Sequence, residues 1–409
     1  MVIAGAVLWI WSSLSDLPLF GESELRWAAL ASVMLMSGAL GRPIAGLPAS
    51  IAGGRSGLIT VGTVGCLVAF AFGSRRTARR LVAVLAVTVA VLTIGMSVWY
   101  EWSSTLGSDI YHAHRLAGAA MASGENPYTD AVRFSDGNPF APPDRVFDGY
   151  PYPPVALLTY GLAGAFTDPM LISTIAWLGF VGWLAWRAIR SRSFEISTVS
   201  LSVLMVMAMA PLGSEVWYMA WTEPLSLILF TGAAIAWNRS TTGAGLLLGL
   251  ALASKQYLIF LAPLLLLHRD LGWRRRSVIA IITAVATLLI GLAPNPAAFV
   301  QATFVNLAGI EFRPDTQSLP GLAAELGLDL LLPNVVWIVL ALAMTTLLAR
   351  SSRTRSGFII RSGLALGAAF LLGMAFPNYW FLVAGLLGLG AILEVEESVA
   401  VNPVELVTV

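Results

Sequence analysis

The sequence predicts an all-α polytopic membrane protein, and three observations support this fold class. Of its 409 residues, 57% are hydrophobic and only 11% are charged, less than half the charged share of about 25% in a typical soluble domain. The chain also contains 14 tryptophans, a residue that is enriched at membrane interfaces. Long apolar runs recur along the chain, and at roughly 20 residues per spanning helix they predict about 11–13 transmembrane helices.

The apolar runs define the expected helices in order. They occupy about 2–14, 27–50, 56–73, 82–99, 170–189, 197–212, 217–237, 243–267, 277–294, 331–349, 357–376 and 379–395. The N-terminal stretch lacks the basic start of a signal peptide, so we expect a retained helix there. We expect three parts: accessory helices in residues 1–80, a core module in 81–295 with a large outer loop at 101–169, and a second outer loop with the C-terminal helices in 296–409.

Arginines at the ends of the apolar runs predict the orientation of the chain, because Lys and Arg near helix ends mark the cytoplasmic side. All the arginine clusters fit that side if the run 243–267 is a hairpin that turns near Lys255 and if residues 153–167 lie along the membrane surface. Several polar segments then share the extracytoplasmic side, namely 101–169, 213–223, 255–257, 295–330 and 377–380. We therefore expect one active site at the extracytoplasmic face.

Charge and cysteine content exclude two classes of function. The net charge of +1 gives no basic face for binding several phosphates, so we expect no nucleic-acid partner. Cys66 is the only cysteine, so the chain can build neither an internal disulfide nor a thiolate metal site.

The polar segment from Ser108 to Pro154 contains the candidate catalytic base. Asp109 follows the 82–99 run by about ten residues, so a rigid helix would hold its carboxylate at the membrane surface. A carboxylate placed there could accept the proton of a hydroxyl nucleophile. The alternative is an aspartate that caps a helix beginning near Ile110.

Two histidines and an arginine follow Asp109 closely. His112 and His114 are two positions apart, which points them to different faces of a helix, so we expect no metal site there. We expect these histidines to contact sugar or acceptor, or to shape the site. Arg115 is a permanent cation beside them and is a candidate phosphate contact.

Aromatic and amide residues later in the same segment are candidate sugar contacts. The sequence Gly-Glu-Asn-Pro-Tyr ends a helix and begins a turn, and within it Asn126 and Tyr128 offer hydrogen bonds to a polyhydroxylated ligand. A loop that merely turns is the alternative. Tyr152 lies in a Tyr-Pro-Tyr-Pro-Pro sequence, which would form a stiff aromatic edge at the level of the lipid headgroups.

Polar residues far along the chain complete the candidate site. Lys255 interrupts an apolar run, and we expect it either to anchor a lipid phosphate or to extend to the headgroups. Glu223 could line an acceptor path or cap a helix. In the second outer loop, Arg313 could bind a phosphate with two N–H groups of its guanidinium, and Gln317 is a candidate sugar contact. Asn378, between two apolar runs, joins the site or forms a simple turn.

Together these residues resemble the integral-membrane glycosyltransferases of the C fold. Within that superfamily the chain is similar to family 87, which contains polyprenyl-phosphomannose-dependent mannosyltransferases. The residues that carry the resemblance are Asp109, Tyr111, Gly124, Asn126, Pro127, Tyr128, Tyr150, Tyr152, Pro153, Pro154, Lys255 and Gln256. One pattern departs from the family: many relatives carry two acidic residues close together in the first loop, whereas here the companions of Asp109 are His112 and His114.

The resemblance implies a specific chemistry. The donor would be a sugar, here expected to be mannose, on a polyprenyl phosphate. The acceptor would be a glycolipid or glycan at the extracytoplasmic face of a bacterial plasma membrane, and the reaction would invert the anomeric centre. Asp109 would be the base, while Lys255, Arg313 and Arg115 would stabilise the leaving phosphate. Gln256 would contact sugar or acceptor. Neither a metal nor another cofactor is implied.

A transporter or flippase for lipid-linked saccharides is the rival hypothesis. Such a protein would carry ionisable residues along a path through the middle of the bilayer. Here these residues gather at one predicted face, which favours a transferase.

Overall fold

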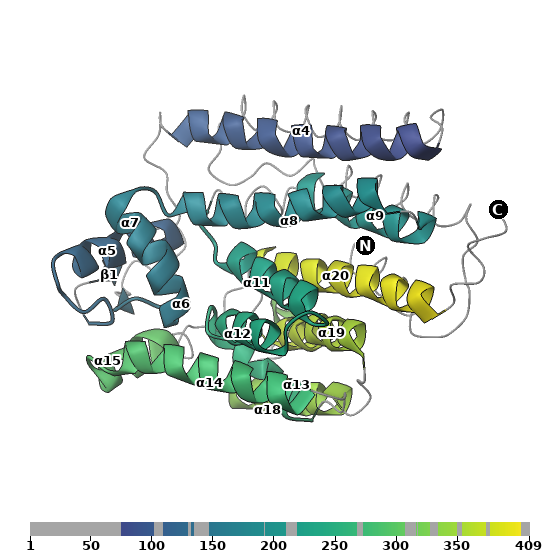
Figure 1. Cartoon of the computed structure of the whole chain (residues 1–409). Coiled ribbons are helices and arrows are strands. Elements are labelled where there is room, and N and C mark those ends of the chain that lie inside the picture. The colour runs from purple at the N-terminus through teal and green to yellow at the C-terminus, as the bar shows by residue number, and fades with distance from the viewer. Residues whose placement is uncertain are drawn as a thin grey trace. The chain divides into compact units, whose positions relative to one another are not determined.

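The computed structural model of the chain describes most of the sequence from Arg75 onward. The described residues are 75–101, 109–129, 132–134, 147–191, 193–209, 219–267, 273–306, 316, 318–327, 334–349, 354–373 and 377–401. Within them the regular structure is almost entirely helical (Figure 1). The three predicted runs before Arg75 lie outside the described residues.

The chain divides into two units, of which the first comprises residues 1–106, 178–215 and 391–409. Its described helices are α4 (Arg75–Glu101) and α9 (Phe194–Met209), with the C-terminal parts of α8 (Met170–Arg190) and α20 (Pro377–Val401). α4 packs against α9. Arg187 forms an ion pair with Glu396, so an arginine at the predicted cytoplasmic end of α8 has a carboxylate partner.

The second unit comprises residues 107–177 and 216–390 and begins with the predicted outer loop. This loop contains α5 (Asp109–Ala122) and two antiparallel strands of two residues each, β1 (Arg133–Phe134) and β2 (Phe147–Asp148). A continuous helical stretch follows, made of α6 (Pro154–Ala156), the π-helical η1 (Leu157–Gly161) and α7 (Leu162–Phe166). Residues 154–166 form an apolar helix of only 13 residues, about 20 Å at 1.5 Å per residue. Such a helix is too short to cross a bilayer core of about 30 Å, and its length agrees with the predicted surface helix.

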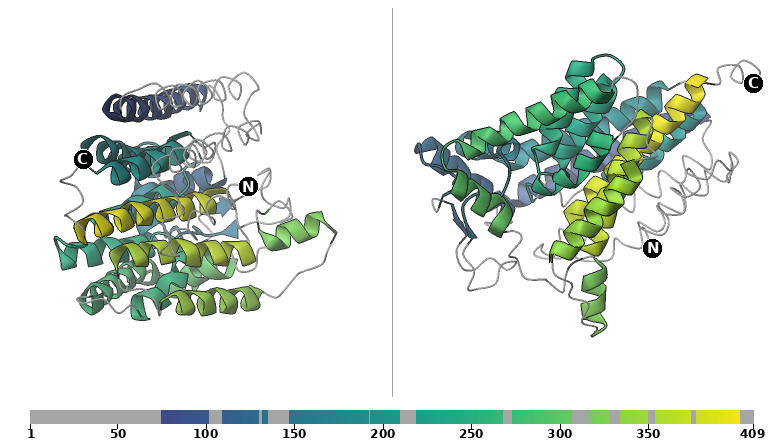
Figure 2. Two further views of the ribbon diagram at one scale, coloured as in Figure 1. Left: turned by 90° about the vertical axis from the view of Figure 1, so that its right-hand side faces the viewer. Right: turned by 90° about the horizontal axis from the view of Figure 1, so that it is seen from below.

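The rest of the second unit is a series of helices and short helical turns (Figure 2). In chain order they are α11 (Glu223–Ala236), α12 (Thr241–Leu252), η2 (Gln256–Leu261), α13 (Ala262–Leu267), α14 (Trp273–Leu292), α15 (Pro296–Val300), η3 (Gln301–Val305), α17 (Leu319–Glu325), α18 (Asn334–Ala349), α19 (Arg355–Leu372) and the N-terminal part of α20. The predicted run 243–267 is broken as expected, because α12 ends three residues before Lys255 and η2 begins directly after it.

Small residues let the helices of this unit approach closely. A Cβ atom on Gly249 of α12 would lie 2.5 Å from the carbonyl oxygen of Ala280 on α14, and one on Gly164 of α7 would lie 2.5 Å from the carbonyl oxygen of His114 on α5. Because real Cβ atoms do not come this close to backbone, glycine sets both packing distances. The second contact places α7 directly against α5.

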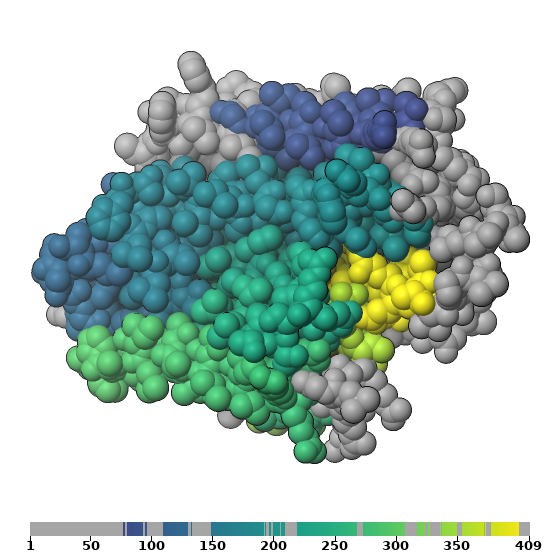
Figure 3. All heavy atoms as spheres, in the orientation of Figure 1, coloured from purple at the N-terminus to yellow at the C-terminus, as the bar shows by residue number. Residues whose placement is uncertain are grey.

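The composition of several helices fits a membrane. Three described helices are long and apolar enough to cross one: Met170–Arg190, Trp273–Leu292 and Asn378–Ala400. On α14, Val278, Ile282, Val285 and Leu289 are exposed at the three- and four-residue spacing of a single helix face, and α14 forms part of the surface in Figure 3. This face suits contact with lipid. The all-α membrane fold predicted from the sequence is confirmed.

Candidate functional site

The centre of the candidate site is a buried ion pair between Lys255 and Glu223. The Lys255 Nζ atom lies 2.9 Å from Glu223 Oε1, and the two side chains are only 2% and 0% exposed. Lys255 directly precedes η2 and has an extended backbone, with φ −150° and ψ 137°, so it lies outside both neighbouring helices. Glu223 is the first residue of α11 and is followed by Pro224, a combination that suits the start of a helix and its dipole.

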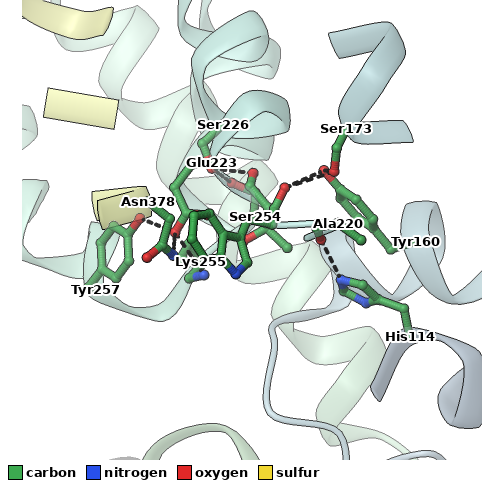
Figure 4. Close-up of polar contacts among 12 residues, drawn as sticks. His114, Tyr160, Ser173, Ala220, Glu223, Ser226, Ser254, Lys255, Tyr257 and Asn378 are labelled. Carbon is green, nitrogen blue, oxygen red and sulfur yellow. Dashed lines mark hydrogen bonds and ion pairs between the residues drawn. The ribbon is translucent and has the colours of Figure 1, made fainter. Parts of the chain in front are cut away.

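Two further donors bind the same carboxylate oxygen. The Tyr257 hydroxyl and the Asn378 Nδ2 group each donate to Glu223 Oε1 at 2.9 Å (Figure 4). The other oxygen, Oε2, is buried and has no hydrogen-bond partner in the described part of the chain. Three donors, from Lys255, Tyr257 and Asn378, therefore meet on Oε1, while Oε2 keeps its full capacity to accept.

Tyrosine rings surround the Lys255 ammonium. Its Nζ atom lies 4.5 Å from the ring centroid of Tyr152, 5.6 Å from that of Tyr257 and 5.7 Å from that of Tyr379. These are cation–π distances, and such contacts partly replace the water that the ammonium loses on burial. The ion pair and the rings together make a charge tolerable at this buried position.

Asp109 belongs to the same cluster. It is the first residue of α5 and is partly exposed, and its charge interacts electrostatically with Lys255. Burial first, and then the charges of Asp109 and Glu223, raise the pKa of Tyr152 well above its ordinary value. The Asp109 Oδ1 atom accepts from the backbone N–H of Ile110 at 2.8 Å, a local contact of the kind that the helix-start alternative anticipates.

His114 lies fully buried with both ring nitrogens in hydrogen bonds. Its Nε2 atom lies 3.1 Å from the carbonyl oxygen of Ala220, and its Nδ1 atom lies 2.8 Å from the Tyr150 hydroxyl. Because a carbonyl only accepts, Nε2 carries the proton and Nδ1 accepts from Tyr150. Burial lowers the pKa of His114 to about 3, so its ring is neutral near neutral pH. Its ring also stacks on Tyr160, with centroids 4.6 Å apart.

The neighbours of His114 on α5 lie at the surface. His112 is exposed, and its ring meets that of Tyr111 edge to face. Arg115 is also exposed and donates to the carbonyl oxygen of Thr167 at 3.0 Å, which ties α5 to the C-terminal end of α7.

Asn126 and Tyr128 shape the loop that holds Tyr152. The Asn126 Oδ1 atom accepts from the backbone N–H of Tyr128 at 3.1 Å, a local turn of the asparagine type. The Tyr128 hydroxyl donates to the carbonyl oxygen of Tyr152 at 3.1 Å. Gly124 has a φ of +75°, as the predicted helix stop requires. The alternative of a structural turn therefore fits both residues well.

The remaining predicted site residues divide into two groups. Gln256 is partly buried next to Lys255, and its buried Oε1 atom has no partner in the described part of the chain. Arg313 and Gln317 lie outside the described residues. Over the ranges given above, no group of three or more His, Cys, Asp or Glu side chains is arranged to hold a metal ion.

The structure thus brings together Asp109, Tyr152, Glu223, Lys255 and Asn378 from five separate segments. Sequence reasoning placed all five in the site but did not pair Glu223 with Lys255. It also passed over the phenol of Tyr257 as a ligand of Glu223. The available signal was the lysine itself, because an ammonium in an apolar run needs a counter-ion.

Comparison with known proteins gives one family and one solved structure. The sequence model for Glycosyltransferase family 87 matches residues 150–376. Among solved structures, the crystal structure of ArnT from Cupriavidus metallidurans bound to undecaprenyl phosphate matches with a TM-score of 0.47 and 17% sequence identity. That match covers 76% of this chain, and the chain spans 60% of the length of that protein. No curated protein sequence matches the chain.

Proposed function

Since the chain belongs to glycosyltransferase family 87, we propose that it transfers a sugar, mannose in the first instance, from a polyprenyl phosphate to a glycolipid or glycan acceptor with inversion. We place the reaction at the extracytoplasmic face of a bacterial plasma membrane. The observation that carries the proposal is the cluster in which Asp109 lies near the buried Lys255–Glu223 pair and its tyrosine rings.

Asp109 is the proposed base. Its carboxylate takes the proton of an acceptor hydroxyl as that oxygen forms a bond to the anomeric carbon of the sugar. The bond between this carbon and the phosphate oxygen breaks, and polyprenyl phosphate leaves with the electron pair. The partial exposure of Asp109 supports this role, because an acceptor can reach a group that is not enclosed.

Lys255 is the proposed contact for the leaving phosphate. An ammonium has three N–H donors, and within the described residues the pair with Glu223 uses one of them, which leaves donors for a phosphate oxygen. Glu223 offsets part of the positive charge, and the site therefore needs a further cation for tight binding. Arg313 and Arg115 remain the proposed candidates for that cation.

The polar groups around Lys255 and Glu223 are the proposed contacts for the hydroxyl groups of the sugar. Glu223 Oε2 is buried without a partner in the described part of the chain, so it has capacity to accept a hydrogen bond from a sugar hydroxyl. The ring of Tyr152 offers an apolar face of the kind on which sugars pack. Asn378, Gln256 and the residues of the predicted second outer loop, including Gln317, are proposed as further contacts.

The proposal is tested with purified protein, polyprenyl-phosphomannose and a membrane glycolipid fraction as acceptor. We expect Asp109→Asn to abolish transfer while donor binding persists, because the amide cannot take the proton. Full turnover by this variant would refute the base assignment.

Asp168→Asn is the matched control. Asp168 is another carboxylate at the start of a helix, where its Oδ1 atom accepts from the backbone N–H of Met170 at 2.8 Å. Asparagine caps a helix about as well as aspartate, so this variant should keep its activity.

Movement of labelled donor across proteoliposomes without its consumption would favour a transporter instead.

A further inference from the structure

A strained turn precedes the helix that carries Glu223. Ala220 has a φ of +53° and is the one non-glycine residue with positive φ in the described part of the chain. This region is disfavoured for residues with a Cβ atom, so surrounding contacts must hold Ala220 there. Glu223 follows only three residues later and begins α11.

Buried donors hold the carbonyl groups of this turn. The Nε2 atom of His114 binds the carbonyl of Ala220 at 3.1 Å. The next carbonyl, that of Trp221, lies 3.0 Å from the Tyr160 hydroxyl and 2.9 Å from Ser173 Oγ. Figure 4 shows His114 and Ser173 extending from two different helices toward this turn.

The tautomer of His114 is itself fixed. The Tyr150 hydroxyl lies 2.8 Å from Nδ1 and donates to it, which leaves the ring proton on Nε2 and directed at Ala220. Tyr150 is fully buried, so no water competes for this bond. A chain of contacts therefore runs from Tyr150 through His114 and Ala220 to the first turn of α11.

We propose that His114 is a positioning residue for the Lys255–Glu223 pair: its imidazole N–H holds Ala220 in the left-handed conformation and thereby fixes where α11 begins and where the Glu223 carboxylate lies. The expected effect of His114 on turnover rests on the proposed function, whereas its effect on the turn at Ala220 does not. In this proposal His114 acts through Glu223 and not through contact with sugar.

The alternative is that His114 only fills space under Tyr160. The two ideas differ at Ala220, because glycine adopts a positive φ without strain. If His114 acts by holding a strained turn, Ala220→Gly relieves that strain, and losing the imidazole then has a much smaller effect. If His114 only packs, Ala220→Gly leaves the cost of losing the imidazole unchanged.

The test compares the wild type, Ala220→Gly, His114→Phe and the double variant. Phenylalanine keeps a ring against Tyr160 but has no N–H. We expect His114→Phe to lower kcat/KM for polyprenyl-phosphomannose by about tenfold, the size of losing the buried hydrogen bond to Ala220. The bond from Tyr150 is lost in both backgrounds, so its loss cancels from the comparison. In the Ala220→Gly background we expect a loss of less than about threefold. Equal losses in both backgrounds would overturn the inference.

Thermal unfolding of the same four proteins in detergent separates this inference from the proposed function. If the wild type transfers no sugar, the proposed function fails, and the coupling between positions 114 and 220 is read from the unfolding midpoints. Additive midpoints would overturn the inference.

Should His114→Phe not fold, Tyr150→Phe replaces it, because it keeps the imidazole and removes only the bond that fixes the tautomer. Equal effects of Tyr150→Phe in the wild-type protein and in the Ala220→Gly background would then overturn it.

Discussion

Replacing Lys255 by methionine tests the central ion pair. Methionine has a similar length and no charge, so the change leaves the Glu223 carboxylate buried without its ammonium. The carboxylate would keep only the neutral donors Tyr257 and Asn378 on Oε1, while Oε2 has no partner in the described residues. The variant therefore isolates the cost of an unpaired buried charge.

The expected loss is large. Removing one partner of a buried ion pair destabilises a protein by about 3–5 kcal/mol, and this range applies here because Glu223 is 0% exposed. The two remaining neutral hydrogen bonds, worth about 1 kcal/mol each, are already present in the wild type and add nothing new. We expect Lys255→Met to lower the free energy of unfolding by about 4 kcal/mol.

The double variant Glu223→Gln with Lys255→Met is the matched control. It removes both charges and keeps the volume, so no charge stays buried without its partner. Unfolding in mixed detergent micelles, followed by tryptophan fluorescence, measures both variants. We expect the double variant to regain most of the loss and to bind polyprenyl phosphate weakly. Equal destabilisation of the single and double variants would refute the reasoning, because it would mean that packing and not charge matters here.

Three further changes follow from the structure. Burial lowers the pKa of His114 from 6.5 to about 3, so between these values the unfolded chain binds a proton that the folded chain does not. The free energy of unfolding should then fall by about 1.4 kcal/mol per unit as pH drops below 6.5, and unfolding midpoints at stepwise lower pH should fall less steeply in His114→Phe. Gly118→Ala should cost about 1–3 kcal/mol, because its Cβ atom would lie 2.6 Å from the backbone oxygen of Gly161; Gly182→Ala, with nothing within 4 Å, is the control in the same unfolding assay. Tyr128→Phe should cost about 1 kcal/mol, because the buried carbonyl of Tyr152 loses its donor, and an unchanged midpoint would contradict this.

Apolar run length predicted the described helices well. The run 82–99 lies within α4, and the runs 277–294 and 357–376 correspond to α14 and α19 within a few residues. The break at Lys255 was also predicted, since a charged residue in an apolar run marks an interruption. α20 extends past the predicted end at 395 to Val401, because glutamate ends an apolar run but is a good helix former.

The partners within the site could not be predicted in the same way. His114 and Ala220 are 106 positions apart, and the acceptor is a backbone carbonyl, which carries no sequence signal. The pair of Asn378 with Glu223 spans 155 positions. Composition identifies such polar residues as unusual, but only the packing of helices decides which of them meet.

The ion pair points to a binding role more strongly than to a structural one. A buried pair of this kind gives little net stability over apolar side chains of the same volume, because the loss of hydration offsets the attraction between the charges. Stability alone therefore does not account for a lysine in the middle of an apolar sequence. The phosphate site proposed above would account for it, because Glu223 is the one described residue paired with the Lys255 ammonium, which has three N–H donors. The held turn at Ala220 fits the same view, since strain at a helix start is explained when the exact place of that start matters.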